Sequence, residues 1–122
     1  MYEGSVWEAI MFAGHHNLSN LALVIDNNKI CMLDYCTKIL NLEPLNIKFE
    51  SFGWQTTVID GHDIEQLYAT FSSLKNDKSS SPKVVIADTV KGKGVPRLET
   101  DSLCHIKALS TDEIEKLLIE MK

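Results

Sequence analysis

Two short apolar runs limit most strongly what this chain can fold into. Leu21 to Ile25 and Val84 to Ala87 are uninterrupted by polar residues, and the first run is closed by Asp26-Asn27-Asn28. Runs of this kind predict strands of a parallel sheet that are buried on both faces. Trp54 to Ile59 predicts another strand. Three strands make a small sheet.

Segments with helical spacing of apolar residues alternate with these strands. Helices are predicted over residues 5–15, 46–52, 64–74 and 110–121, and irregular structure over 29–44 and from Gly92 to Leu109. Asp63 with Gln66, and Ser110 with Glu113, have the spacing of helix-capping pairs. The pattern predicts an α/β fold, a three-layer parallel sheet with flanking helices, whose ligands bind beyond the carboxyl ends of the strands.

The length and net charge of the chain limit the classes of partner that it can have. The chain has 122 residues, which suits one domain spanning 1–122, and a net charge of −5, which argues against a nucleic-acid partner. No apolar stretch is long enough to span a membrane, so we expect a cytoplasmic protein. Cys31, Cys36 and Cys104 are odd in number and lack metal-ligand spacing, so we interpret them as reduced thiols.

The polar residues that close the first strand are the most informative for chemistry. Asparagine and aspartate oxygens are hard ligands that suit Mg²⁺ or Ca²⁺, and the backbone carbonyl of Ile30 lies two residues beyond Asn28. A plain Asx turn accounts for the same residues. The spacing alone favours the turn.

Several motifs resemble those of a known enzyme family. They include Glu3 to Ala9, His15 to Leu21, Ile25 to Ile30, Ile59 to Asp63 and Val90 to Val95. The first three resemble the second half of the thiamine diphosphate motif of transketolases, which opens with Gly-Asp-Gly in that family. The resemblance covers nearly the whole chain, is closest to separately encoded N-terminal transketolase subunits, and implies a partial thiamine diphosphate-binding fold.

The resemblance implies two metal ligands. Asn28 matches the side-chain ligand of the Mg²⁺ that bridges the cofactor's diphosphate, and Ile30 matches the residue that gives its carbonyl. Mg²⁺ takes few protein ligands, so each one matters. The family's other protein ligand, the aspartate of Gly-Asp-Gly, has no counterpart here.

Three further residues match family positions near the cofactor. Glu3 and Glu8 match acidic residues near the cofactor and the dimer interface, whereas their spacing alone indicates solvated charges at a helix start. His105 matches a histidine near the cofactor phosphates and the substrate, where it would donate to a phosphate oxygen or move a proton. The family has Trp-His-Gly where this chain has Cys104-His105-Ile106. An isoleucine in place of that glycine restricts the loop backbone.

The implied activity is transfer of a two-carbon ketol unit between sugar phosphates, with thiamine diphosphate and Mg²⁺ as cofactors. The implied partners are sugar phosphate substrates and either a second copy or a C-terminal transketolase subunit. We do not expect an isolated segment of this kind to turn over. A non-catalytic module that keeps the fold, or a related transfer such as dihydroxyacetone or deoxyxylulose phosphate synthesis, are the alternatives.

Overall fold

The computed structural model describes residues 1–32, 34–106 and 108–120. The chain forms two compact units. The first, made of Met1–Asn27 and Glu43–Asp88, contains the sheet, and the second is made of Asn28–Leu42 and Thr89–Lys122.

The sheet has three parallel strands, β1 (Ala22–Asn27), β2 (Gln55–Asp60) and β3 (Lys83–Asp88), at the places where the sequence predicts strands. Their spatial order is β1-β3-β2, so the last strand in the chain lies in the middle. Asn27 and Asp60 both stand in register with Asp88. All three strands therefore end at the same edge of the sheet.

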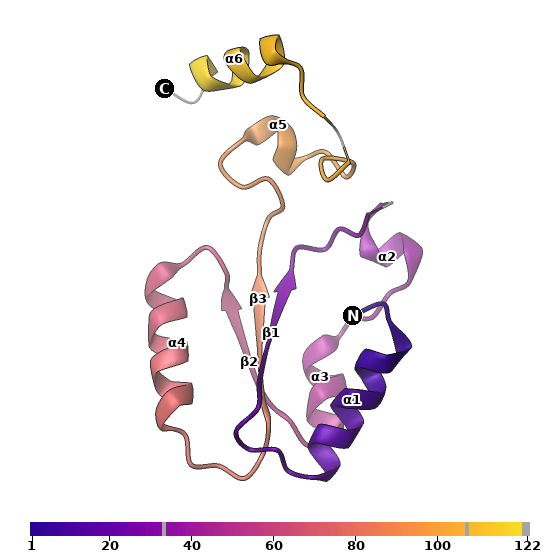
Figure 1. Cartoon of the computed structure of the whole chain (residues 1–122), viewed down its shortest axis with the longest axis vertical. Coiled ribbons are helices and arrows are strands. Elements are labelled where there is room, and N and C mark those ends of the chain that lie inside the picture. Colours follow the sequence, from indigo (N-terminus) through magenta and orange to yellow (C-terminus); the bar gives the residue numbers. More distant parts are fainter. Residues whose placement is uncertain (33, 107, 121–122) are drawn as a thin grey trace. The chain divides into compact units, whose positions relative to one another are not determined.

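Helices cover both faces of this sheet, which confirms the predicted three-layer arrangement (Figure 1). On one side lie α1 (Gly4–His15) and α3 (Leu45–Ser51), and on the other lies α4 (Ile64–Asn76). Under α4, the core contains Ile59, Val85 and Ala87, with Leu67 and Leu74 packed against it. Successive side chains of a strand point to opposite faces of the sheet. One strand can therefore contact the helices on both sides.

Close contacts join α1 to the segment that follows α3. The Trp54 indole Nε1 donates to the Ile10 carbonyl at 2.9 Å, and the Trp54 ring meets the fully buried Phe49 ring edge-on at 5.4 Å. A Cβ atom placed on Gly14 would lie 1.9 Å from the Phe52 carbonyl oxygen. The backbones of α1 and this turn thus approach as closely as only glycine allows.

The prediction that the first strand is buried on both faces is wrong. In β1 only Ile25 is buried, and Val24 is 50% exposed, whereas β3 is buried from Lys83 to Ala87. Position in the sheet explains the difference. The run in β3 lies between two strands, while the similar run in β1 lies at an edge.

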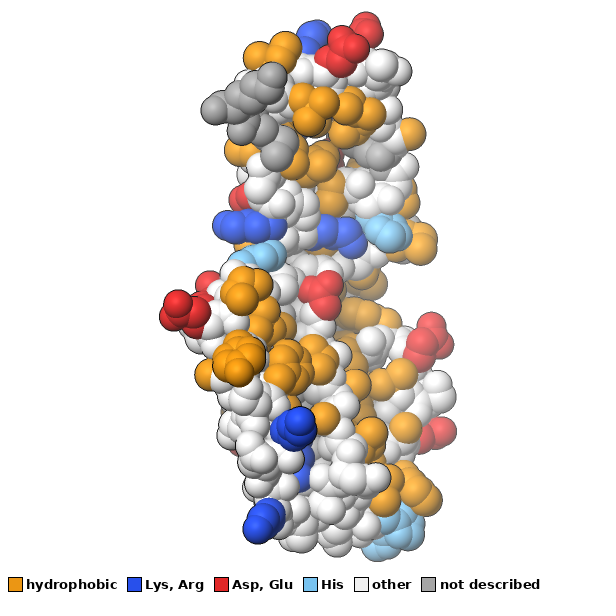
Figure 2. Space-filling model, turned by 60° about the vertical axis from the view of Figure 1, so that its left-hand side comes forward, with side chains coloured by type: hydrophobic (Ala, Val, Ile, Leu, Met, Phe, Trp, Pro, Cys, Tyr) orange, Lys and Arg blue, Asp and Glu red, His pale blue; other side chains and the backbone are white. Residues whose placement is uncertain are grey.

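The helical stripes are also less buried than their spacing predicts. Met11 of α1 is 45% exposed, and three apolar residues of α4, namely Ile64, Tyr68 and Phe71, lie at the surface. Figure 2 shows the side of the unit that carries α4, where hydrophobic side chains reach solvent. Among the described residues, no helix is long and apolar enough to cross a membrane.

The second unit contains three short helices, α2 (Cys36–Ile39), α5 (Pro96–Glu99) and α6 (Thr111–Glu120). The first two lie in segments predicted to be irregular, because one helical turn is too short to show a period. Ser110 and Glu113 cap α6 as predicted, with Ser110 N donating to Glu113 Oε2 at 3.0 Å. The helical spacing of Ile114, Leu117, Leu118 and Met121 predicts that all four face inward. In the structure Leu117 is buried and Ile114 and Leu118 are exposed, and Met121 lies outside the described residues.

Candidate functional site

Polar side chains gather in the first unit where the strands end. Asn27 Nδ2 donates to Asp88 Oδ1 at 2.9 Å and to Glu43 Oε1 at 3.2 Å, and the second Glu43 oxygen accepts the Leu45 N–H at the start of α3. Asn27 thereby joins the end of β1 to the end of β3 and to α3. The sequence alone does not predict this link, because an irregular segment separates Glu43 from the strand.

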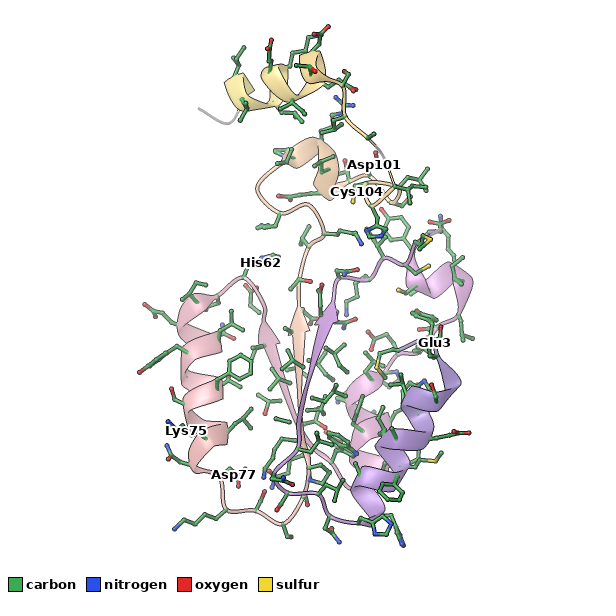
Figure 3. All side chains as sticks on the ribbon, in the orientation of Figure 1. Glu3, His62, Lys75, Asp77, Asp101 and Cys104 are labelled. Atoms are coloured by element: carbon green, nitrogen blue, oxygen red, sulfur yellow. The ribbon has the colours of Figure 1, made fainter. Side chains whose placement is uncertain are left out.

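A turn follows β2 and leads into α4, and Asp63 in this turn caps the helix. Asp63 accepts backbone N–H groups of Glu65 and Gln66 at 2.9 and 3.0 Å, which confirms it as the cap of α4. The Gln66 side chain donates to Asp63 Oδ2 at 2.7 Å instead of reaching the Asp63 backbone. His62 lies in this turn (Figure 3). These bonds lower the pKa of Asp63 below its ordinary value, chiefly through the Gln66 backbone and side-chain N–H groups.

The residues that directly follow β1 form a tight turn. Asn28 Oδ1 accepts the Ile30 N–H at 3.0 Å, and Lys29 between them has a φ of 63°, in the left-handed region. Beyond the turn, Ile30 pairs with Tyr35 in an antiparallel bridge, and Cys31 N donates to Asp34 O at 3.0 Å. The Asx turn that the spacing favours is therefore present. It also fixes the orientation of the Asn28 amide.

The oxygens of this turn suit a hard cation. In the part of the chain that the structure describes, no three His, Cys, Asp or Glu side chains come together to hold a metal. Asn28 Oδ1 accepts the Ile30 N–H, and the half-buried Asn28 and Ile30 are two residues apart in one turn. Mg²⁺ prefers oxygen ligands of this kind, so the donor set fits part of a magnesium site.

Glu3 and Glu8 lie on the first unit. Glu3 is the residue before α1, as Figure 3 shows, and its side chain makes no capping hydrogen bond to the helix. Both carboxylates are exposed.

His105 lies on the second unit, in the turn that follows α5. Asp101 shapes this turn, because its carboxylate accepts the Leu103 N–H at 2.9 Å and its carbonyl accepts the Cys104 N–H at 3.1 Å (Figure 3). The His105 side chain is exposed. Ile106 is not among the described non-glycine residues with positive φ, so the turn here has a backbone that isoleucine adopts without strain.

Comparison with known proteins decides the family. The family model described as transketolase, thiamine diphosphate binding domain, matches residues 1–121. The chain belongs to the transketolase family. Its fold agrees, because it superposes on crystalline transketolase of Campylobacter jejuni with a TM-score of 0.83 at 32% identity, over 98% of this chain and 18% of that one.

Relatives of this transketolase domain are longer. It is 40% identical to a transketolase family protein, y4mO of Sinorhizobium fredii, over 91% of this chain and 40% of that protein. It is 37% identical to an apulose-4-phosphate transketolase subunit of Actinobacillus succinogenes, over 98% of this chain and 43% of that protein. Against mouse transketolase the identity is 34%, and the match spans 18% of that enzyme. The chain thus spans between about a fifth and about two fifths of these relatives.

Proposed function

We propose that this transketolase domain supplies two oxygen ligands, Asn28 Oδ1 and the Ile30 carbonyl, to a Mg²⁺ ion that holds the diphosphate of thiamine diphosphate. One observation carries the proposal most directly. The Asn28 to Ile30 turn closes on itself at 3.0 Å immediately after a parallel strand, where ligands bind in open α/β sheets. The family match to a thiamine diphosphate binding domain supports it.

Each residue of the turn has a separate role in this proposal. Lys29 adopts the left-handed backbone that turns the chain, and the Asn28 amide is held by the Ile30 N–H. A ligand oxygen that is fixed before the metal arrives does not have to be ordered on binding, which favours affinity. Other ligands would come from the diphosphate, from water and from protein groups outside this turn.

The activity we propose is transfer of a two-carbon ketol unit between sugar phosphates in the cytoplasm, through the pentose phosphate pathway. The cofactor, when bound, supplies the electron sink for this chemistry. The chain's own groups would bind and orient. We propose that His105 donates a hydrogen bond to a phosphate oxygen, and that Glu3 and Glu8 act as carboxylates beside the cofactor at a subunit interface. Their exposure leaves them accessible for these roles.

The partner we propose is either a second copy or a C-terminal transketolase subunit. A relative that is 37% identical to this chain, and that is named as one subunit of an apulose-4-phosphate transketolase, supports a site shared between chains. A module that keeps the fold and binds other chains without thiamine chemistry is the second candidate function. A related ketol transfer remains the third candidate.

A ligand-observed titration separates these functions. The ³¹P signals of thiamine diphosphate are followed as the chain is added, with and without Mg²⁺. We expect weak binding that requires Mg²⁺, and Asn28→Ala should weaken it about tenfold, because one of few protein ligands is lost.

The matched control is Asn76→Ala. Asn76 ends α4 between Lys75 and Asp77, at the opposite end of the helix from His62 (Figure 3), and its side chain bonds only within the helix, to Ser72 O at 3.1 Å. This variant should bind as the parent chain does. Binding that ignores Mg²⁺, or equal binding by the parent chain and Asn28→Ala, would contradict the proposal and leave the interaction module as the better account.

A further inference from the structure

In the second unit, the segment that begins at Lys29 folds back on itself as a short hairpin. An antiparallel bridge pairs Ile30 with Tyr35. The two backbone hydrogen bonds that flank the bridge are Cys31 N to Asp34 O, at 3.0 Å, and Cys36 N to Lys29 O, at 2.9 Å. Bonds on either side of an unbonded pair are one of the two patterns of an antiparallel ladder, so they fix the register of the hairpin.

This register brings two cysteines to one face of the hairpin. Successive residues of a strand point to opposite faces, so Cys31 and Cys36 share the face that the bridged pair does not use. Position 34 stands opposite position 31, and Cys36 lies two residues beyond it, which makes the two cysteines diagonal neighbours. Diagonal neighbours lie about 7–8 Å apart. The Cys31 sulfur points across the hairpin, because it donates to the Asp34 carbonyl at 3.2 Å.

Both thiols are reduced and partly open to solvent. Cys31 and Cys36 are free cysteines, and each side chain is half-buried. Structural zinc sites use four ligands, whereas no three His, Cys, Asp or Glu side chains gather within the described residues to hold a metal. The chemistry that fits two thiols on one face is therefore exchange with a disulfide.

We propose that Cys31 and Cys36 form a redox-modification site, which a small disulfide such as oxidised glutathione converts reversibly into a Cys31–Cys36 disulfide. One cysteine thiolate attacks a sulfur of the small disulfide and displaces one thiolate from it. The other cysteine thiolate attacks the cysteine sulfur of this mixed disulfide, which forms the Cys31–Cys36 bond and releases the second thiolate. The two cysteines lose two electrons and two protons, and the small disulfide becomes two thiols.

The diagonal geometry makes this bond a reversible one. Disulfides usually join residues whose Cα atoms are about 4.4–6.8 Å apart, so the Cys31–Cys36 diagonal must shorten by about 1 Å. A disulfide that strains the backbone is more easily reduced, and strained disulfides are the regulatory ones. The dithiol is therefore the form that a reducing compartment maintains, and the disulfide forms when the oxidised small thiol accumulates.

Shortening the diagonal acts on the turn beside it. The Cys36 N–H is bonded to the Lys29 carbonyl, and Lys29 is the left-handed residue, with a φ of 63°, between Asn28 and Ile30. A movement of Cys36 therefore moves the turn. The effect on cofactor binding rests on the proposed function: oxidation displaces the Asn28 and Ile30 oxygens, and the oxidised chain binds thiamine diphosphate with Mg²⁺ more weakly.

Thiol mapping tests the redox site without any metal. The chain is equilibrated with about 1 mM each of reduced and oxidised glutathione, alkylated and mapped by peptide mass, and we expect the Cys31–Cys36 bond in more than half of the molecules. Dithiothreitol should restore both thiols. Cys31→Ser and Cys36→Ser should lack the internal bond, whereas the matched control Cys104→Ser should form it as the parent chain does. Thiols at positions 31 and 36 that both remain alkylated, or a bond from either one to Cys104, would overturn the proposal.

Two measurements then follow the turn and the cofactor. On oxidation, the ¹³Cβ signals of Cys31 and Cys36 should move to the range of oxidised cysteine, and the amide signals of Lys29 and Ile30 should shift. Thiamine diphosphate with Mg²⁺ should bind about tenfold more weakly to the oxidised chain, and Cys36→Ser treated in the same way should show no change. Equal binding by the oxidised and reduced parent chain would overturn the link to the turn. A chain that forms the disulfide but binds no cofactor in either state would contradict the proposed metal site and support the redox site alone.

Discussion

Asn28 and Ile30 are tied together by a 3.0 Å hydrogen bond from the Ile30 N–H to Asn28 Oδ1, across a left-handed Lys29 with a φ of 63°. Both oxygens that we propose as magnesium ligands therefore belong to one turn. The left-handed region is costly for residues with a Cβ atom, and most costly for β-branched ones. Lys29 is the residue through which the turn can be tested without removing either ligand.

The free energy of unfolding of variants at position 29 should depend on how readily the new residue adopts the left-handed backbone region. Lys29→Gly should leave the free energy of unfolding unchanged or higher, whereas Lys29→Val should lower it by about 1 kcal/mol or more. Urea unfolding measures both. A valine variant as stable as the glycine variant would show that position 29 is not left-handed in solution.

Gly14 and Gly4 both lie in α1, but only Gly14→Ala should lower the free energy of unfolding strongly. A Cβ at Gly14 would meet the Phe52 carbonyl oxygen at 1.9 Å, while one at Gly4 meets nothing within 4 Å. We expect Gly14→Ala to lower the free energy of unfolding by about 3 kcal/mol or more, because two backbones must separate. Gly4→Ala should change it by less than about 1 kcal/mol. Equal effects would mean that α1 does not pack on the turn at Phe52.

Replacing each of the two tryptophans should lower the free energy of unfolding by a different amount. Trp54 is 4% exposed and donates to the Ile10 carbonyl at 2.9 Å, whereas the half-buried Trp7 donates to the Met1 carbonyl at 3.0 Å. Trp54→Phe should cost about 1 to 3 kcal/mol, and Trp7→Phe clearly less, since the Trp54 bond is buried and links distant segments. Chemical denaturation followed by circular dichroism compares them. A larger loss for Trp7→Phe would contradict this packing.

In the second unit, Glu113 should titrate abnormally low. Arg97 Nη2 donates to Glu113 Oε1 at 2.6 Å, and Ser110 N donates to the other oxygen at 3.0 Å. The Arg97 side chain first, and then the Ser110 backbone, lower the pKa of Glu113 from 4.5 to about 2. A depressed folded pKa stabilises the folded state above pH 4.5, and this contribution is lost as pH falls from 4.5 toward 2.

Carboxyl ¹³C chemical shifts measure that titration directly. Arg97→Gln should move the Glu113 midpoint back up toward 4.5, because the largest cause of the shift is removed. The control is Arg97→Lys, which keeps the charge and should retain part of the shift. A parent-chain midpoint near 4.5 would show that the Arg97–Glu113 pair does not form in solution.

The sequence predicted local features well and distant relations poorly. The two apolar runs located β1 and β3, and the segment from Trp54 to Ile59 located β2. The capping pairs at Asp63 and Ser110 located the starts of two helices, because a cap depends on residues near in the chain. Strand order did not follow from the runs. The middle position of β3 decides that Val85 is fully buried while Val24 is half exposed, although both lie in similar runs.

The candidate site also combines a local feature, which the sequence predicts, with distant contacts, which it does not. The turn from Asn28 to Ile30 could be predicted from the chain, because it joins residues two apart, whereas their role as metal ligands is implied by the family resemblance. The bonds from Asn27 to Glu43 and Asp88 could not, since they connect positions 16 and 61 residues away. Only the folded sheet brings those residues together at its carboxyl edge.

Paramagnetic relaxation by Mn²⁺, which replaces Mg²⁺ at oxygen sites, tests the central claim most directly. In amide-resolved NMR spectra of the chain, we predict that trace Mn²⁺ first broadens the Asn28 side-chain amide and the backbone N–H signals of Ile30 and Cys31, and that excess Mg²⁺ restores them. Asn28→Ala should abolish this broadening. Broadening that begins instead at Asp60 and Asp88, and is unchanged in Asn28→Ala, would contradict the account.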